Sequence, residues 1–307
     1  MRAKIAISIG DIQGVGPEIA LKAHFSISQS CQPIYCVHSE LLAQANARLS
    51  HAYTKALENM QCAAPKAAQP TIKPASIDKE SGFYSHASFL RALDLADDGV
   101  VSGVCTLPIH KHAWQLAGIA TPGHTAFLRQ RYRQEAIMML GCPKLWVALF
   151  SEHIPLSAVS TKVCLEPLKE FLHTLAQVLD TPEPIVVLGI DPHCGDNGAI
   201  GVQDKEVQEA IEQANALLNT SKFLGPVPAD SAFSPHFRAK HRHFVALYHD
   251  IGLAPLKALY FEESINVSLN LPIKRASVDH GCAFDIAYQN KASPKSYENA
   301  IRWLVGL

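Results

Sequence analysis

Three histidines occupy similar places in the sequence, each a few residues after a short apolar run. The runs and histidines are 145–150 before His153, 185–190 before His193, and 244–247 before His249. Such runs predict buried strands, and open α/β sheets bind ligands beyond the carboxyl ends of their strands. Neutral imidazoles suit Zn²⁺ or Co²⁺, and three protein ligands leave positions open for substrate. The spacing therefore predicts a catalytic metal site at these three histidines.

Charged residues around His249 extend this chemistry. Asp250 follows directly, and Lys257 and Arg275 come soon after. An Arg side chain can hold a carboxylate or phosphate through two parallel hydrogen bonds. The combination of metal-binding histidines and cations predicts a site for a small anionic substrate.

A second candidate anion site lies at 121–125. Pro122 and Gly123 predict a turn, and His124 and Thr125 are expected to begin a helix. The free N–H groups at a helix start favour anions. Thr125 as a simple helix cap is the alternative, and it is compatible with phosphate binding.

The elements that must position these residues can be read from hydrophobic patterning. Strands are expected at 5–9, 33–37 and 99–106, and helices after 16, from 39 to 45, from 81 to 97 and from 293 to 307. The Ala- and Pro-rich stretch 63–74 is expected to be a surface connection. After His249, Gly252 and Pro255 are expected to end any regular element.

A glycine-rich loop with Gly10, Gly14 and Gly16 follows the first expected strand. It is not the dinucleotide fingerprint, because Ile19 stands where the third glycine belongs, and no Walker A lysine follows. Ligand contact and a plain structural turn both remain open for this loop.

Composition limits the class of protein. The chain has 307 residues, 48% of them hydrophobic and 18% charged, with a net charge of -1. These values indicate a globular protein and argue against nucleic-acid or membrane-surface binding. No apolar run approaches the about 18 residues that a membrane span needs. The eight cysteines are scattered without a C-x-x-C pair, which favours reduced thiols in the cytoplasm.

Taken in order, the motifs resemble those of the 4-hydroxythreonine-4-phosphate dehydrogenase family of pyridoxal phosphate biosynthesis. They run across nearly the whole chain: Gly10-Asp11, Gly14-x-Gly16-Pro17-Glu18, Pro122-Gly123-His124-Thr125, His153-x-Pro155-Leu156, Asp191-Pro192-His193-x-Gly195, Pro228-Ala229-Asp230, Tyr248-His249-Asp250-x-Gly252 and Ser277-Val278-Asp279-His280-Gly281. An ordered set of this kind is far more specific than any single motif.

The resemblance implies a three-layer α/β/α fold of the isocitrate-dehydrogenase type, with two lobes around a central cleft. The approximate lobes are 1–128 with 276–307, and 129–275, the second carrying the interface of a homodimer. It also implies NAD-dependent oxidation of 4-phosphooxy-L-threonine, followed by decarboxylation to 3-amino-2-oxopropyl phosphate. NADP is the alternative cofactor, and the metal is Zn²⁺, Co²⁺ or Mg²⁺.

Carried over by position, the resemblance assigns the metal ligands and the substrate contacts. The metal ligands are His153, His193 and His249, one of them donated across the dimer interface. The substrate contacts are His124, Thr125, Lys257, Asn266 and Arg275. Asp230, Asp250 and Lys257 are the candidate catalytic residues, without an assignment of the general base.

The chain departs from the family pattern at four positions. Ile12 and Gln13 replace the usual Pro-Ala, Ile251 replaces Gln, and Asn270 replaces Gly. These departures affect the expected substrate and cofactor more than the reaction class. A related dehydrogenase of phosphorylated four-carbon sugar acids and a non-catalytic metal-binding protein are the alternatives.

Overall fold

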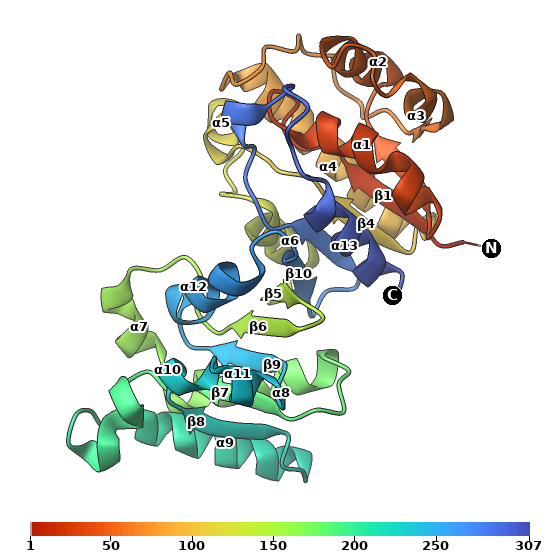
Figure 1. Ribbon diagram of the computed structural model, residues 1–307. Coiled ribbons are helices and arrows are strands. Elements are labelled where there is room, and N and C mark those ends of the chain that lie inside the picture. Colours follow the sequence, from red (N-terminus) through yellow and green to blue (C-terminus); the bar gives the residue numbers. More distant parts are fainter. Residues whose placement is uncertain (1) are drawn as a thin grey trace. The chain divides into compact units, whose positions relative to one another are not determined.

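The computed structural model describes residues 2–307, which group into two compact units (Figure 1). Within the described residues, unit 1 comprises 2–134, Ile265–Val267 and Leu271–Leu307, and unit 2 comprises Glu135–Ser264 and Ser268–Asn270. The approximate lobe boundaries near 128 and 275 stay a prediction. Arg275 begins a strand that pairs within unit 1.

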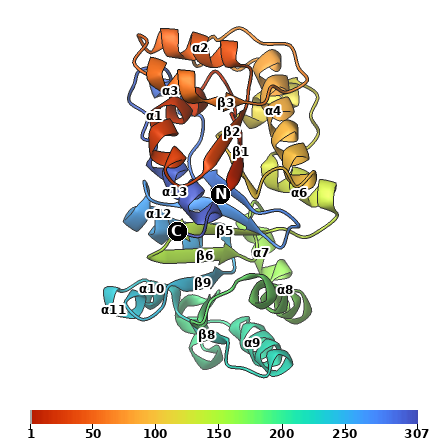
Figure 2. The same cartoon turned by 90° about the vertical axis from the view of Figure 1, so that its right-hand side faces the viewer.

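Unit 1 contains a parallel sheet in the order β3-β2-β1-β4-β11. Its strands are β1 (Lys4–Ser8), β2 (Gln32–Cys36), β3 (Gln61–Cys62), β4 (Gly103–Thr106) and β11 (Arg275–Val278). Its helices are α1 (Gly16–Ser28), α2 (Ser39–Arg48), α3 (Thr54–Asn59), α4 (Lys79–Asp97), α5 (Lys111–Leu116), α6 (His124–Tyr132), η2 (Phe284–Ile286) and α13 (Lys295–Leu304). Figure 2 shows α1 and α13 on one face of this sheet and α4 on the other.

Unit 2 contains a mixed sheet in the order β5-β6-β9-β7-β8, in which only the β5–β6 pair is antiparallel. Its strands are β5 (Ile137–Cys142), β6 (Leu145–Leu149), β7 (Ile185–Leu188), β8 (Phe223–Val227) and β9 (His243–Ala246). Its helices are α7 (Leu156–Lys162), α8 (Leu165–Val178), η1 (Pro192–Gly198), α9 (Asp204–Leu218), α10 (Ala229–Ala232), α11 (Pro235–Arg238) and α12 (His249–Tyr260). One further strand, β10 (Ile265–Leu269), contributes residues to both units.

Both sheets have the continuous apolar strands of a doubly covered parallel sheet. Every residue of β7 is buried, as are four of the five residues of β1. In unit 2, Leu253 and Leu256 of α12 pack on one face of the sheet, and Figure 2 shows α8 and α9 on the other. The expected α/β fold with helices on both faces is thus confirmed.

The expectation that Gly252 and Pro255 end regular structure after His249 is wrong. Both lie inside α12, which runs from His249 to Tyr260. A Cβ added at Gly252 would lie 2.6 Å from side-chain atoms of both Ala246 and Val147, so only glycine lets the helix approach the sheet this closely. Tertiary packing therefore overrides the weak helix propensity of these two residues.

The glycine-rich loop after β1 is anchored by buried side chains of unit 1. The Gln13 side chain donates to the carbonyl oxygen of Thr71 and to Oδ2 of Asp78, both at 3.0 Å, and accepts from the Lys73 amide. Gln13, a departure from the family pattern, thus fixes the segment that leads into α4. For this position the structure favours the structural alternative over ligand contact.

The carboxyl group of Asp11 is fully buried in the same loop. Its Oδ1 accepts the Gln13 amide at 3.0 Å, and its Oδ2 is 3.5 Å from the Ser81 hydroxyl. Burial raises the pKa of Asp11 to about 6, because the two hydrogen bonds only partly offset the lost hydration of its charged form.

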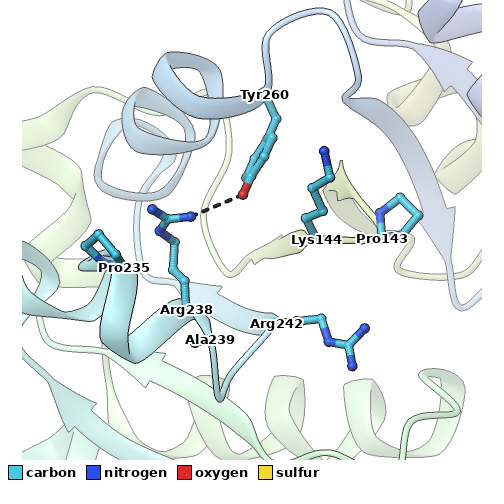
Figure 3. Close-up of a pocket in the computed structure, with 7 residues that line it drawn as sticks. All are labelled: Pro143, Lys144, Pro235, Arg238, Ala239, Arg242 and Tyr260. Carbon is cyan, nitrogen blue, oxygen red and sulfur yellow. Dashed lines mark hydrogen bonds between the residues drawn. The ribbon is translucent and has the colours of Figure 1, made fainter.

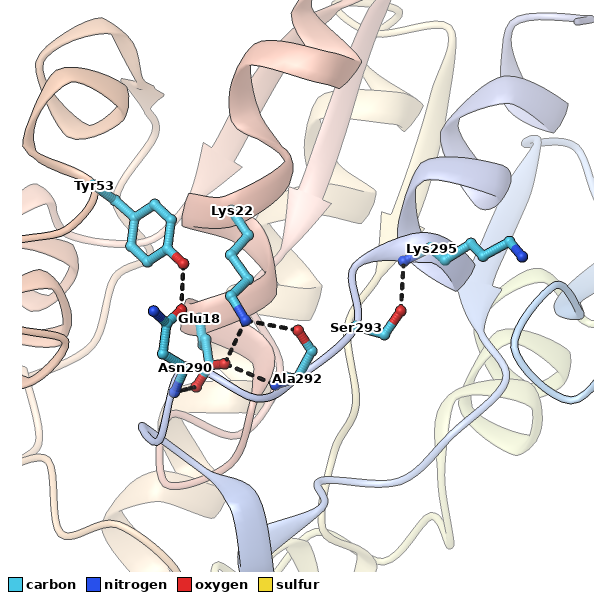
Figure 4. Close-up of polar contacts among 7 residues, drawn as sticks. All are labelled: Glu18, Lys22, Tyr53, Asn290, Ala292, Ser293 and Lys295. Carbon is cyan, nitrogen blue, oxygen red and sulfur yellow. Dashed lines mark hydrogen bonds and ion pairs between the residues drawn. The ribbon is translucent and has the colours of Figure 1, made fainter.

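A second buried carboxylate, Glu18 of α1, holds the chain that precedes α13 (Figure 4). It accepts the amides of Ala292 at 2.9 Å and Asn290 at 3.3 Å, and Lys22 donates to it at 3.0 Å. Lys22 also donates to the Ala292 carbonyl oxygen at 2.8 Å, and Tyr53 donates to the Asn290 side chain. The acid of the Gly-Pro-Glu motif is therefore a structural tether between the two ends of the chain.

We predict that Glu18→Ala lowers the free energy of unfolding by about 2–4 kcal/mol, because one buried amide, one partly buried amide and one ammonium lose their acceptor. Urea denaturation followed by circular dichroism measures the change. Glu58→Ala removes an exposed carboxylate on α3 and is expected to change stability by less than about 0.5 kcal/mol. Equal stabilities of the two variants would contradict the tether.

Asp11 is expected to make stability depend on pH. The folded-state pKa of Asp11 lies above the unfolded value of about 4. Its contribution to the free energy of unfolding is therefore full below about pH 4 and is lost as the pH rises through about 6. Between pH 4 and pH 7, the free energy of unfolding of Asp11→Asn should rise by on the order of 2 kcal/mol relative to that of the wild type. Urea denaturation across this range tests it, and a constant difference between the two proteins would exclude it.

Candidate active site

Strand order in unit 2 brings the three predicted histidines to one edge of the sheet. Strands β6, β9 and β7 are neighbours and run parallel, so their carboxyl ends lie along the same edge. His153 follows β6, His249 opens α12 after β9, and His193 lies in η1 after β7. The expectation that each histidine follows a strand end is confirmed.

Two of these rings lie close together. The ring centroids of His153 and His249 are 5.7 Å apart, with an angle of 43° between the planes. Nδ1 of His249 is 2.6 Å from Oδ1 of Asp250. A carboxylate in this place fixes the proton on Nδ1 and leaves Nε2 as a lone-pair donor, which is the usual arrangement around a metal-binding imidazole.

His193 is placed differently. It is exposed on η1, where the backbone is left-handed at His193, Cys194, Asp196 and Asn197. Asp204 fixes the start of this segment, since its carboxylate accepts the Ile190 amide at 3.0 Å and the Asp191 amide at 2.9 Å. Among residues 2–307, no three His, Cys, Asp or Glu side chains gather in a metal-binding group. The single chain thus brings together His153 and His249.

Two predicted catalytic residues, Asp230 and Lys257, lie on helices α10 and α12 of unit 2. Asp230 is exposed in α10, where its Oδ1 accepts the Ser231 amide at 2.9 Å. Lys257 lies on α12 with its ammonium 5.3 Å from the centre of the Phe261 ring.

Burial, and then the carboxylates of Asp204, Asp230 and Asp191, raise the pKa of Cys194 to about 11, which keeps this thiol protonated.

In unit 1, Arg275 forms a cluster with two other predicted substrate residues. Arg275 is only 2% exposed. Its Nη1 donates to Oδ1 of Asn266, and its Nη2 donates to Nδ1 of His124, both at 3.4 Å. Burial lowers the pKa of Arg275 to about 10, which still leaves it charged at neutral pH. An anion bound here would offset the cost of burying this cation.

His124 begins α6, as expected. The cap of α6 is Gly123 rather than Thr125, which is the second helical residue, so the cap alternative for Thr125 is wrong. The His124 ring packs edge-on against Phe89, at 4.6 Å between centroids, and Trp114, at 5.5 Å. Burial, followed by the nearby Arg275 charge, lowers the pKa of His124 well below its usual value, so the ring is neutral. Because Arg275 donates to Nδ1, the ring proton lies on Nε2.

Sequence reasoning missed one residue of this cluster. Thr106 is fully buried at the end of β4, and its Oγ1 accepts a hydrogen bond from Nη2 of Arg275 at 2.7 Å. Its position as the last residue of an expected strand was the available signal, because polar residues at strand ends often face a ligand.

The remaining departures from the family pattern have local structural explanations. Asn270 has a φ of 58° and donates to the Glu135 carbonyl oxygen at 2.8 Å, and asparagine tolerates this left-handed conformation better than other residues with a side chain. Ile251 packs against the apolar core of unit 2. Ile12 is buried, and its carbonyl oxygen accepts the Tyr288 hydroxyl.

A separate depression of about 360 Å³ in unit 2 contains none of the predicted site residues (Figure 3). It is lined by Pro143, Lys144, Pro235, Arg238, Ala239, Arg242 and Tyr260. Lys144 pairs with Glu263 at 3.0 Å and Arg242 with Glu183 at 2.8 Å, while Arg238 donates to the Tyr260 hydroxyl at 3.1 Å. Two of its three cations thus have carboxylate partners.

Among residues 2–307, no helix combines the length and apolar character needed to cross a membrane.

Comparisons with known proteins agree with these features. The chain matches the family model described as pyridoxal phosphate biosynthetic protein PdxA over residues 29–304. It is 54% identical to a 4-hydroxythreonine-4-phosphate dehydrogenase of Helicobacter pylori (strain J99) over 309 aligned residues, covering 99% of each chain. It is 48% identical to the protein of that name from Sulfurimonas denitrificans, covering 100% of this chain and 98% of the other.

Solved structures give the same result. A crystal structure of 4-hydroxythreonine-4-phosphate dehydrogenase from Klebsiella pneumoniae superimposes with a TM-score of 0.83 at 27% identity, covering 99% of this chain and 98% of that one. The corresponding values for the Burkholderia phymatum protein of the same name are 0.77 and 30%, with the same coverage. By sequence and fold, the chain belongs to the PdxA family of pyridoxal phosphate biosynthetic proteins.

Proposed function

We propose that this protein is the cytoplasmic, nicotinamide-dependent dehydrogenase that oxidises 4-phosphooxy-L-threonine in pyridoxal phosphate biosynthesis. The oxidised product then loses CO₂ to give 3-amino-2-oxopropyl phosphate. The observation that carries the proposal is about half sequence identity, over essentially the full length, to enzymes named for this dehydrogenase activity. NAD is the proposed hydride acceptor, and the functional unit is proposed to be a homodimer.

The residues of unit 2 fit a divalent metal. His153 and His249 lie close together, and Asp250 holds the His249 ring with Nε2 available as a ligand. His193 of the partner subunit is the proposed third ligand, because the single chain does not gather three such side chains within residues 2–307. When bound, Zn²⁺, Co²⁺ or Mg²⁺ supplies a Lewis acid that favours ionisation of the substrate hydroxyl and polarises the resulting carbonyl.

The chain's own groups bind and orient the anionic substrate. Arg275 is proposed to hold an anionic group of the substrate, and the neutral His124 ring and Asn266 lie beside its guanidinium. Thr125, next along α6, is proposed to contact the same group. Lys257 supplies a second cation.

The three candidate catalytic residues divide by what they contact. Asp250 acts through His249, because its carboxylate is already bonded to Nδ1. Asp230 and Lys257 remain as the candidates for moving the hydroxyl proton during hydride transfer. The hydride chemistry belongs to the nicotinamide, so the protein's contribution is orientation and proton transfer.

The activity itself is tested by following NADH formation with 4-phosphooxy-L-threonine, and NADPH formation with NADP. A phosphorylated four-carbon sugar acid serves as the competing substrate. Turnover of the sugar acid alone would replace the proposed substrate, and no turnover of either would contradict the dehydrogenase.

Metal dependence gives a sharper prediction. Chelation should abolish NADH formation and added Zn²⁺, Co²⁺ or Mg²⁺ should restore it, while His153→Ala, His193→Ala or His249→Ala should each lower kcat/KM at least about 100-fold. His236→Ala, which removes an exposed histidine of α11, is the matched control and should keep full activity.

Mixing inactive His193→Ala and His249→Ala subunits should restore activity, because a mixed dimer then contains one site with three intact ligands. Failure of the mixture to recover activity would contradict the donation of His193 by the partner.

Removal of the buried cation should mainly affect substrate binding. Arg275→Met is expected to raise the KM for 4-phosphooxy-L-threonine about 100-fold, because charge-assisted hydrogen bonds to the anion are lost. Steady-state kinetics measure the change, and circular dichroism confirms that the variant folds. An unchanged KM in a folded variant would remove Arg275 from the substrate site.

A further inference from the structure

We propose that Thr106 is a positioning residue whose hydroxyl sets the orientation in which Arg275 receives the anionic substrate. The inference rests on the proposed function of Arg275 and extends it to a residue outside the motifs. Thr106 is placed in contact with Arg275 and acts through it.

Strand register explains why these two side chains meet. In the parallel β4–β11 pair, Arg275 lies opposite Val104, and Ser277 lies opposite Thr106. Residues two apart on a strand share a face, so Arg275 and Thr106 are diagonal neighbours on the same face of the sheet. A long side chain can span this diagonal, and the Arg275 guanidinium reaches Thr106 at the carboxyl end of β4.

The hydrogen bond to Thr106 is the shortest of the three described for this guanidinium. Nη2 is 2.7 Å from Oγ1 of Thr106, whereas the bonds to His124 and Asn266 are both 3.4 Å long. A hydroxyl accepts the N–H but carries no charge. Thr106 therefore orients the guanidinium without itself neutralising its positive charge.

The acceptor is itself well fixed. The Thr106 side chain is fully buried, and a β-branched residue in a strand has few χ1 rotamers. The Ser277 hydroxyl donates to the Thr106 carbonyl oxygen at 2.9 Å, which holds the backbone at this point. Because Nη2 also donates to Nδ1 of His124, a fixed guanidinium in turn keeps the His124 proton on Nε2.

The test compares Thr106→Val, which keeps the shape and loses the acceptor, with Thr106→Ser, which keeps the acceptor. Isothermal titration with 4-phosphooxy-L-threonine, without nicotinamide cofactor, measures binding separately from turnover. Thr106→Val should weaken binding about tenfold, the effect of one lost hydrogen bond to a charged group, and Thr106→Ser should recover most of it. Ser277→Ala, which removes the bond to the Thr106 backbone but keeps the Thr106 hydroxyl, should weaken binding less than Thr106→Val does.

Two further measurements separate positioning from a structural role. In Thr106→Val the KM should rise while kcat remains near its wild-type value, because the reacting groups are intact, and circular dichroism confirms that the variant folds. In an Arg275→Met background, Thr106→Val should have no further effect on binding, since there is no guanidinium left to orient. Unchanged binding in Thr106→Val, no recovery in Thr106→Ser, or an equal loss in the Arg275→Met background would each overturn the proposal.

The binding test of Thr106 and the activity test of the proposed dehydrogenase can fail independently when the wild-type protein binds the substrate. A wild-type protein that binds 4-phosphooxy-L-threonine but reduces neither NAD nor NADP would contradict the dehydrogenase activity, and the binding comparison would still decide the role of Thr106. A wild-type protein that does not bind this compound would contradict both.

Discussion

Parallel pairing of neighbouring strands is the constraint on which the candidate metal site depends. Because β6, β9 and β7 run in one direction, the segments after them emerge at one edge of the unit 2 sheet. Residues separated by about a hundred positions in the sequence, such as His153 and His249, are thereby brought within contact distance. The close approach of α12 to the sheet, which Gly252 permits, then fixes where His249 begins that helix.

Unit 1 depends in a similar way on buried polar groups that are satisfied internally. Glu18 accepts two backbone amides from the chain before α13, and Gln13 ties the loop after β1 to the segment before α4. These bonds hold loops at the strand ends with little regular structure of their own. Polar groups are stable inside a protein when their donors and acceptors have partners. The motif acid Glu18 supplies such a partner to the backbone before α13, which explains its structural role.

Arg275 is held by hydrogen bonds to three neutral acceptors. The hydroxyl of Thr106, the amide of Asn266 and the neutral ring of His124 hold its guanidinium in place without supplying a negative charge. Such an arrangement is preorganised for an anion, since the cost of orienting the cation has been met during folding. The family's phosphorylated substrate provides an anion of the appropriate kind.

The sequence by itself determined the α/β class, most strands, the start of α6 at His124 and the positions of three histidines after strand ends, because apolar periodicity and turn residues are local signals. Ordered motifs also determined the family. Tertiary structure decided what depends on contacts between distant segments: the helical path of Gly252 and Pro255, the separate placement of His193, and the bond between Arg275 and Thr106. Only strand register brings residues 106 and 275 together, and register is a property of the folded sheet that no local stretch of sequence contains.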